Sequence, residues 1–339
     1  MNAKETAQYR WDHVAKPLNS LGKLEKLIVK IAGVQGTPDV CIDKRCALVF
    51  CGDHGVVAEG VSQSGSEVTA LVAKSIAEDT ANINLMASVS LTDVFAVDMG
   101  MVSAVPGTID HRIAAGTRNM VHGPAMTRAQ AEQAIQAGID LVGKMKARGY
   151  QIIATGEMGI GNTTASTAMA CALLDCTPTA LTGRGAGLSD AGLIRKREAI
   201  TRALAVNQPD ANDPIDVLAK VGGFEIAGMA GAFLGGMQHG VPIIMDGVIS
   251  AVAALAAARI CPAAVDSILP SHMSREPAMV RILAELGMEP ILHADMALGE
   301  GTGAVALLPL LDMALRVYHG PHTFDDLGMA AYTPQEEQS

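Results

Sequence analysis

The stretch Gln151-Ile-Ile-Ala-Thr155, followed without a break by Gly156-Glu-Met-Gly-Ile-Gly-Asn-Thr-Thr164, decides the fold class. Its first part is an apolar run of strand length, and the glycines that follow are typical of a turn that leads into a helix. An apolar strand without alternation needs a sheet that is covered on both faces. The segment therefore predicts one β-α unit of a doubly wound α/β fold.

The same pattern recurs along the chain. Apolar runs that end in a polar or Gly-rich turn occur at 46–51, 93–97, 151–155, 241–245, 267–269 and 290–293. Helical patterns separate these runs, which implies parallel pairing with right-handed crossovers. We therefore predict a mainly parallel six-stranded sheet flanked by helices, in a Rossmann-like catalytic domain over residues 41–313.

The two ends of the chain do not follow this pattern. An apolar stripe at helical spacing is formed by Leu21, Leu24, Leu27, Ile28 and Ile31. We expect residues 1–40 and 314–339 to pack together as a small helical subdomain beside the sheet, with residues 331–339 frayed.

The composition excludes several classes of protein. Of the 339 residues, 49% are hydrophobic and 18% charged, so the chain has material for a core and is not a disordered protein. A net charge of −10 and 3% aromatic residues argue against binding to nucleic acid or an anionic membrane. Six cysteines without a C-x-x-C pair indicate reduced thiols rather than disulfides or a zinc site. Without a membrane span or a secretion signal, we expect a cytoplasmic protein.

Two glycine clusters are candidates for phosphate binding. The turn 156–164 allows backbone N–H groups at a helix start to approach an anion, although a tight strand-to-helix turn is the alternative. The second cluster, Gly183-Arg-Gly-Ala-Gly187, precedes a helical pattern that carries Lys196. A lysine there can balance the charge of a phosphate, whereas a lone helical lysine is usually solvated. Together the two elements suggest a nucleotide-like substrate.

Carboxylates beside glycines are candidates for acid–base chemistry. Glu300, in Leu298-Gly-Glu-Gly-Thr-Gly303, is sterically open and could accept a proton, or it could serve only the dipole of the next helix. Glu157 has the same ambiguity. The segment Gly52-Asp-His-Gly55 is interpreted as a loop braced by an Asp/His pair, in preference to a metal or acid–base site.

As a set, these segments resemble the nicotinate-nucleotide–dimethylbenzimidazole phosphoribosyltransferases, which assemble the nucleotide loop of cobalamin. The resemblance extends from about Lys16 to the helix after Glu300. The matching segments are Ser20-Leu-Gly-Lys-Leu-Glu25, Gly52-Asp-His-Gly-Val56, 156–164, Gly183-Arg-Gly185, Val221-Gly-Gly-Phe-Glu225, Asp246-Gly247, Ser271-His272 and 298–303.

The resemblance implies a reaction and its partners. A benzimidazole-type base attacks C1′ of nicotinate mononucleotide, nicotinate leaves, and the product is α-ribazole 5′-phosphate. Neither a cofactor nor a metal is implied, because no pyrophosphate departs. The family is dimeric, with a parallel six-stranded sheet and a small helical domain from both termini, so a homodimer is expected.

The resemblance also implies site residues. Glu300 takes the general-base position and Glu157 that of a second active-site carboxylate. The phosphate and nucleotide would be held by Gly159, Gly161, Asn162, Thr163, Gly185, Lys196, Asp246 and Ser274. Ser64, Val72 and Leu298 would line the base pocket.

The sequence departs from the family pattern near that pocket. Ala297 stands where the family usually has Arg, Val72 where close relatives commonly have Gln, Leu18-Asn19 where Pro-Gly is usual, and Ala278 near a common Gly. Without the Arg and the Gln, the surroundings of the base are less polar, which leaves the preferred base open. The alternative is one subunit of a heterodimeric relative that attaches phenolic bases and is inactive or weak without its paralogous partner.

Overall fold

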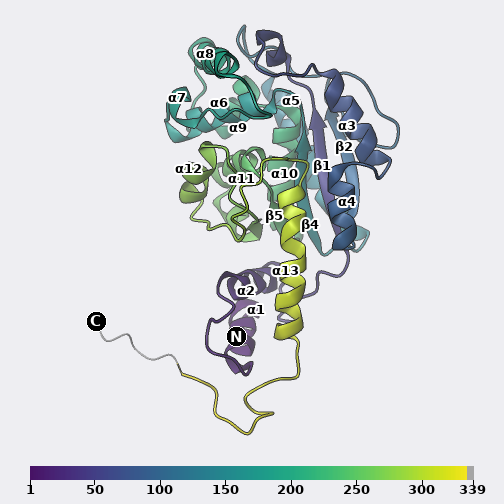
Figure 1. Ribbon diagram of the computed structural model, residues 1–339, viewed down its shortest axis with the longest axis vertical. Coiled ribbons are helices and arrows are strands. Elements are labelled where there is room, and N and C mark those ends of the chain that lie inside the picture. Colours follow the sequence, from purple (N-terminus) through teal and green to yellow (C-terminus); the bar gives the residue numbers. More distant parts are fainter. Residues whose placement is uncertain (334–339) are drawn as a thin grey trace, which may run out of the picture.

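Six parallel strands form one sheet at the centre of the molecule (Figure 1). The structure is a computed structural model that describes residues 1–333. The strands are β1 (Arg45–Gly52), β2 (Asp93–Gly100), β3 (Ile109–Asp110), β4 (Ile152–Met158), β5 (Ile243–Met245) and β6 (Ile268–Pro270), in the order β3-β2-β1-β4-β5-β6. Every pairing is parallel, and the direction of winding reverses between β1 and β4. The predicted doubly wound α/β fold is confirmed.

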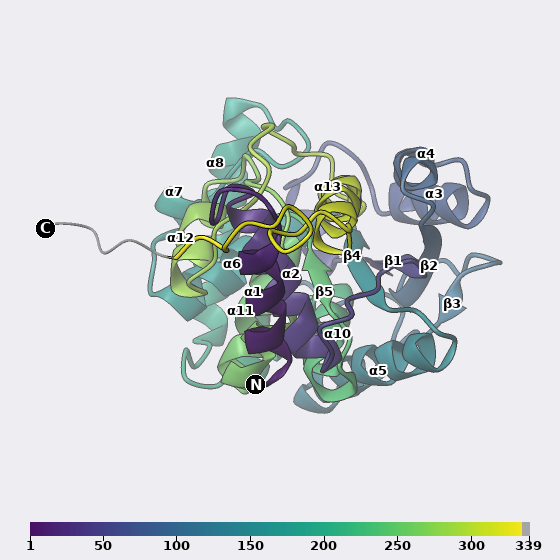
Figure 2. The same ribbon diagram turned by 90° about the horizontal axis from the view of Figure 1, so that it is seen from below.

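Helices cover both faces of the sheet. One face carries α10 (Phe224–His239), α11 (Val248–Ile260) and, behind α10, α5 (Arg128–Ala147). The other carries α3 (Glu67–Ala77), α4 (Asn82–Val89) and α13 (Thr302–Tyr318) (Figure 2). Leu48 and Phe50 of β1 lie in one apolar cluster, whereas Ala47 and Val49 lie in the other. This explains why the strand has no polar face, and each such side chain contributes about 1.5–3 kcal/mol when buried.

The remaining helices connect these layers. They are α6 (Asn162–Leu174), α7 (Pro178–Leu181), α8 (Asp190–Asn207), α9 (Pro214–Val221), α12 (Ala278–Glu285), and the 3₁₀ helices η1 (Gly55–Glu59) and η2 (Pro262–Ser267). Two of these helices begin at side-chain caps. Ser189 accepts from the Gly192 N–H, and Asp213 accepts from the two N–H groups that follow Pro214. Such caps satisfy backbone donors that the helix itself leaves unpaired.

The small residues of α10 allow it to lie against α5. A Cβ on Gly231 would collide with the Ile135 carbonyl, and one on Gly235 would lie 3.0 Å from the Ile139 Cα. The two helix backbones are therefore in contact. The Gly- and Ala-rich composition of residues 224–240 is thus explained within one chain.

Two strands differ from the expectation. Residues 290–293 form no strand; Leu292 makes a single parallel bridge to His272. Pro290 has no N–H to donate, and β6 ends at Pro270. The pairing between residues 290–293 and the segment after β6 therefore does not extend beyond this bridge. The sixth strand is instead β3, whose two residues pair with the end of β2. A two-residue strand is too short to give a sequence pattern.

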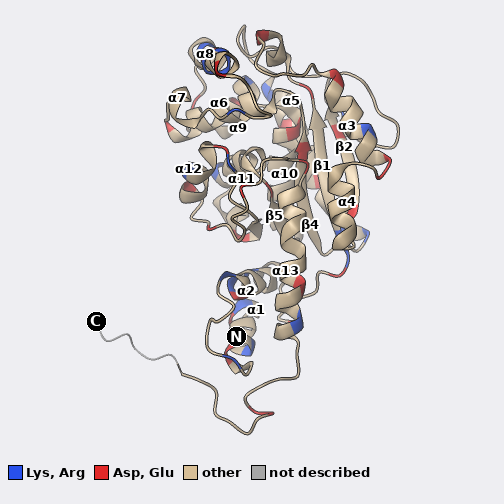
Figure 3. Cartoon of the chain, viewed as in Figure 1, with Lys and Arg blue, Asp and Glu red and all other residues tan. Residues whose placement is uncertain are grey.

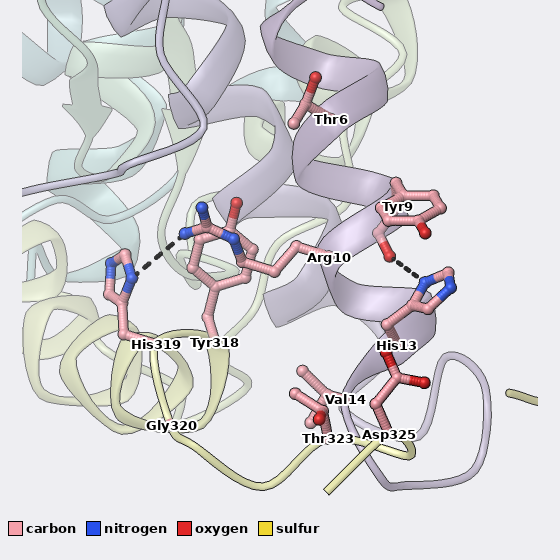
Figure 4. Close-up of a pocket in the computed structure, with 10 residues that line it drawn as sticks. All are labelled: Thr6, Tyr9, Arg10, His13, Val14, Tyr318, His319, Gly320, Thr323 and Asp325. Atoms are coloured by element: carbon pink, nitrogen blue, oxygen red, sulfur yellow. Dashed lines mark hydrogen bonds between the residues drawn. The ribbon is translucent and has the colours of Figure 1, made fainter. Parts of the chain in front are cut away.

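The N-terminal helices pack against the end of α13. Helix α2 (Lys23–Gln35) packs on it directly, and α1 (Ala3–His13) meets it through Trp11, whose ring lies 5.0 Å from that of Tyr318. Val14 pairs with Thr323 in an antiparallel bridge. A cavity of about 460 Å³ lies between α1 and residues 318–325, at the end of α13 and just after it. There Arg10 points toward Tyr318 and His319 (Figure 4). The proposed subdomain division remains a prediction; α13 crosses its boundary at 314 as one helix, and residues 334–339 lie outside the described residues.

Positive charge is spread over the molecule. On the face seen in Figure 3, Lys and Arg occur on several elements, among them α8, α3 and the N-terminal helices. Within residues 1–333, none of the helices combines the length and the apolar run that a bilayer span requires.

Candidate active site

The carboxyl ends of β4, β5 and β6 meet at one edge of the sheet, where a cavity of about 260 Å³ opens. The edge lies beside the reversal of winding, which is where open α/β sheets bind ligands. Most of the predicted site residues line this cavity: Val72, Glu157, Gly159, Asn162, Thr163, Gly185, Asp246, Ser274, Leu298 and Glu300.

Three predicted residues lie outside it. Gly161 lines a smaller neighbouring cavity of about 70 Å³, which Thr163 and Gly185 also border. Lys196 lines neither cavity; it is fully buried and contacts Thr163, which borders both. Ser64 lines neither of them, and its N–H faces the Ser62 hydroxyl at 3.3 Å. Its assignment to the base pocket remains a prediction.

Glu157 is a buried carboxylate of the cavity wall. It lies at the end of β4 with 7% of its surface exposed, and the Asn162 amide donates to its Oε2. Burial, followed by the negative charges of Asp246 and Glu225, raises the pKa of Glu157 well above its ordinary value, against the effect of the Asn162 hydrogen bond. Burial thus disfavours the charged form of this carboxyl group, and a cation bound beside it would favour the carboxylate.

Asp246, at the end of β5, caps a helix from another part of the chain. Its Oδ1 accepts from the Ala304 N–H at 2.9 Å and its Oδ2 from the Gly301 N–H at 3.2 Å. These groups belong to the first turn of α13, whose own N-cap, Gly301, has no side chain to do this. Burial raises the pKa of Asp246, while His272 and these N–H groups lower it. Asp246 therefore fixes the segment that carries Glu300.

Glu300 has an unusual backbone conformation. Its φ is +61°, between Gly299 at +85° and Gly301 at +91°. For a residue with a Cβ this costs roughly 1–2 kcal/mol, and such strain persists where the surroundings impose it. Its Oε2 accepts from the Ile83 N–H at 3.2 Å, in the first turn of α4. This hydrogen bond holds the side chain at the cavity wall, where a general base would have to lie.

Lys196 links the two glycine turns. Its ammonium donates to the Thr163 hydroxyl at 2.8 Å, and a Cβ on Gly185 would lie 3.5 Å from its Nζ. No carboxylate of the described residues lies within ion-pair distance of it. Burial lowers the pKa of Lys196 to about 8, and the charge of Glu276 partly opposes this. A buried ammonium without a close counter-ion is suited to an anionic ligand.

Two titratable residues of the cavity wall, Glu276 and His272, were not predicted as site residues. Glu276 accepts from the Gly185 N–H at 3.0 Å and so holds the second glycine turn. His272 faces Asp246 at 3.9 Å and the Ser271 hydroxyl at 3.0 Å. Sequence analysis gave His272 only within the family match Ser271-His272 and did not single out Glu276. Their position directly after β6 was the signal that could have found them.

The segment 52–55 is braced, but not by an Asp/His pair. Asp53 accepts from the Val102 N–H at 2.7 Å, whereas the partner of His54 is Glu225 of α10, at 2.6 Å. That partner lies far away in the sequence, so the local pattern could not reveal it. Within residues 1–333, no three His, Cys, Asp or Glu side chains are grouped as metal ligands would be.

Comparison with known proteins agrees with this geometry. A family model described as "Phosphoribosyltransferase" matches residues 1–329. The nicotinate-nucleotide–dimethylbenzimidazole phosphoribosyltransferase of Acetivibrio thermocellus is 44% identical over 333 residues, which are 98% of this chain and 95% of the relative. The enzyme of the same name from Geobacter metallireducens is 44% identical over 326 residues, with coverage of 95% and 92%.

Solved structures show the same fold. The crystal structure of CobT from Thermus thermophilus matches with a TM-score of 0.91 at 39% identity, covering 97% of this chain and 99% of that one. A crystal structure of the nicotinate-nucleotide–dimethylbenzimidazole phosphoribosyltransferase from the same organism matches with a TM-score of 0.89. Fold and site thus define an α/β enzyme of the phosphoribosyltransferase class. The chain belongs to the nicotinate-nucleotide–dimethylbenzimidazole phosphoribosyltransferase family.

Proposed function

We propose that this chain transfers 5-phosphoribosyl from nicotinate mononucleotide to 5,6-dimethylbenzimidazole or a similar base. The products are nicotinate and α-ribazole 5′-phosphate, used in cobalamin nucleotide-loop assembly. The observation that carries the proposal is the buried ammonium of Lys196, placed between two glycine turns at the strand edge that also holds Glu157 and Glu300. A phosphate at one end of the cavity then leaves the sugar facing the two carboxylates.

The phosphate would occupy the cradle between the glycine turns. Lys196 supplies charge, and the Thr163 hydroxyl and the N–H groups of the first turn, at Gly159 and Gly161, supply donors. Gly185, whose own N–H is held by Glu276, borders the cradle. Asn162 holds Glu157 in place. Asp246 and Ser274 line the cavity wall where the nucleotide would lie.

The transfer exchanges one C–N bond for another. A ring nitrogen of the base attacks C1′ from the face opposite to the pyridinium, so the β linkage becomes α, and the electron pair of the broken bond stays on the nicotinate nitrogen. Glu157 stabilises the positive charge that develops on the ribose. Glu300 accepts the proton from the other nitrogen of the base. Val72 and Leu298 form an apolar wall for the base.

A second candidate function rests on the composition of this wall. Val72 and Ala297 both line the cavity, at positions where the family commonly has Gln and Arg. A less polar pocket suits a phenol, which is the acceptor in heterodimeric relatives. In that case the chain is one subunit that is inactive or weak without its paralogue.

We further propose that the protein is a homodimer in the cytoplasm, and the six unbridged cysteines fit a reducing compartment. Light scattering on the purified protein should then give twice the chain mass of 35.0 kDa. A monomer that gains activity when the paralogue is added would favour the heterodimer instead.

The decisive experiment is a chromatographic assay of the purified chain with nicotinate mononucleotide. 5,6-Dimethylbenzimidazole, phenol and p-cresol are supplied in parallel as acceptors. Release of nicotinate together with an α-riboside phosphate is expected, and it ranks the acceptors. A folded protein that is silent with every base would contradict the proposal for the chain alone.

A further inference from the structure

A chain of hydrogen-bonded hydroxyl groups lies in the core beside the active-site edge. The Oγ1 of Thr155, on β4, is 2.8 Å from the carbonyl oxygen of Ile244 on β5 and 2.7 Å from the Oγ of Ser250 on α11. The Ser250 Oγ accepts from the Asp246 N–H at 3.2 Å. Thr155 and Ser250 are 0% and 1% exposed, so solvent does not compete for these bonds.

The order of these contacts fixes the direction of each hydrogen bond. A carbonyl oxygen can only accept, so the single hydroxyl proton of Thr155 is donated to Ile244. The Oγ1 of Thr155 then accepts from the Ser250 hydroxyl, whose own oxygen accepts from the backbone N–H of Asp246. In this assignment all three contacts are hydrogen bonds and no hydroxyl proton is left unused. Removing one member of such a buried chain leaves its neighbours without a partner.

The chain of hydroxyl groups ends at Asp246, the residue that caps α13. The carboxylate of Asp246 accepts from the Gly301 and Ala304 N–H groups. Its own backbone N–H is held by Ser250, so the turn that carries this carboxylate is tied to the core. Glu300 directly precedes Gly301, and its backbone position therefore depends on where Asp246 is held.

Strand β4 also touches the segment of Glu300 directly. A Cβ on Gly156 would collide with the Glu300 carbonyl oxygen, so the two backbones are in contact. Thr155 precedes this glycine and does not line the cavity, so its hydroxyl touches no substrate there. The φ of +61° at Glu300 is a strained conformation that the surroundings have to impose. The tie through Asp246 and the contact at Gly156 supply that constraint.

We propose that Thr155 and Ser250 are positioning residues for the proton acceptor of the transfer reaction. Their hydroxyl groups hold the turn at Asp246, and Asp246 holds the backbone at Glu300, which brings the Glu300 carboxylate to the cavity wall. The role of Glu300 rests on the proposed function, whereas the hydrogen-bonded arrangement is a property of the ligand-free protein. Breaking the chain of hydroxyl groups should therefore reduce kcat through Glu300 and leave the phosphate cradle unaffected.

The test is a double-mutant cycle between Thr155→Val and Glu300→Gln. Valine keeps the branched shape of threonine without its hydroxyl, so the strand should be retained. Thr155→Val should lower kcat roughly tenfold and change KM for nicotinate mononucleotide by less than about twofold. In the Glu300→Gln background the same substitution should not lower kcat further, because the group that it positions is already absent. Losses of kcat that multiply in the double variant would overturn the proposal.

Two further variants separate this role from a loss of stability. Thr155→Ser keeps a hydroxyl and should retain most of the kcat of the parent protein. Thr92→Val breaks a similar buried pair, in which the hydroxyl oxygens of Thr92 and Ser90 are 2.8 Å apart, at the opposite edge of the sheet just before β2. This control should lower the unfolding temperature and leave kcat unchanged. An equal loss of kcat in Thr92→Val would overturn the proposal, because general destabilisation would then explain the effect.

A measurement without substrate separates this proposal from the proposed reaction. Amide hydrogen exchange at Gly301 and Ala304 should be faster in Thr155→Val and in Ser250→Ala than in the parent protein, because the carboxylate that protects these amides is held less firmly. Exchange in Thr92→Val should match that of the parent. Unchanged exchange in Thr155→Val and Ser250→Ala would overturn the proposal. A parent protein without transferase activity would instead be a failure of the proposed function.

Discussion

The ammonium of Lys196 donates a hydrogen bond to the hydroxyl of Thr163 at 2.8 Å, and this contact joins two glycine turns that lie apart in the sequence. The lysine is fully buried, so its charge is maintained against the desolvation that lowers its pKa to about 8. The arrangement is costly in the ligand-free protein and becomes favourable when an anion arrives.

Replacing Lys196 should stabilise the ligand-free protein and weaken its binding of nicotinate mononucleotide. The pKa falls from 10.5 to about 8, so the buried ammonium destabilises the ligand-free fold at pH 7 by an amount on the order of 3 kcal/mol. Lys196→Met should unfold at a temperature about 2 °C higher or more, while KM for nicotinate mononucleotide rises roughly tenfold. Calorimetry and steady-state kinetics measure the two effects. The exposed Lys144→Met is the control and should change neither.

Substrate binding should weaken above pH 8. The folded-state pKa of Lys196 lies below the unfolded value of 10.5, so the cation is lost as the pH rises through about 8. The same change removes its destabilising effect between about pH 8 and pH 10.5. KM for nicotinate mononucleotide should therefore increase over a range in which the ligand-free protein becomes more stable. In Lys196→Met this pH dependence of KM should be absent; its persistence would assign the titration to another group.

Glu300→Gln should abolish the proton transfer and little else. The amide oxygen of Gln can still accept from the Ile83 N–H, so the strained turn should be retained. We expect kcat to fall by a factor of roughly 10² or more, with KM for nicotinate mononucleotide unchanged. Nicotinate release measures both constants. A folded variant with an unchanged rate would mean that another group accepts the proton.

Asp246→Ala should lower stability and kcat together. The variant leaves the Gly301 and Ala304 N–H groups without a partner, which costs about 1–3 kcal/mol in the free energy of unfolding. Because Glu300 immediately precedes this helix turn, its position should loosen and kcat should fall. Urea unfolding and steady-state kinetics are the measurements. Asp246→Asn keeps one acceptor oxygen, so its stability and kcat should lie between those of the parent protein and of Asp246→Ala. A variant that only binds the nucleotide more weakly would show instead that Asp246 acts as a substrate contact.

The base pocket should respond to restored polarity. Val72 and Ala297 line the cavity, so Val72→Gln combined with Ala297→Arg places donors where the base would lie. We expect the ratio of kcat/KM for dimethylbenzimidazole to that for p-cresol to rise by about tenfold, the scale of one or two specific contacts. Parallel assays with both acceptors measure the ratio. An unaltered ratio would place the determinant of acceptor choice elsewhere.

The fold could be predicted because each buried strand carries its own signal. The run at 46–51 is apolar without alternation, and the structure divides its side chains between two cores. Short edge elements lack such a signal. Strand β3 consists of two residues, and the apolar run at 290–293 cannot pair beyond one bridge because of Pro290.

The site was predictable in part for a similar reason. Glu157 stands beside a glycine directly after the apolar run 151–155, which marks the strand edge from sequence, and Glu300 stands between two glycines before an apolar helical pattern. The hydrogen bonds that hold the site together join residues far apart in the sequence. Asp246 caps α13, and His54 pairs with Glu225. These partners are so far apart in the sequence that a local pattern of residues cannot reveal them. Only folding brings such groups together.

The contact of Trp11 with Tyr318 has a consequence for biosynthesis. A ribosome produces α1 and α2 first, yet the helix they pack on emerges roughly 300 residues later. Until then α1 and α2 can pack on each other but not on α13, and a nascent chain would expose the apolar surface that this helix covers or present it to a chaperone. The first helices to be made are thus among the last to reach their native place.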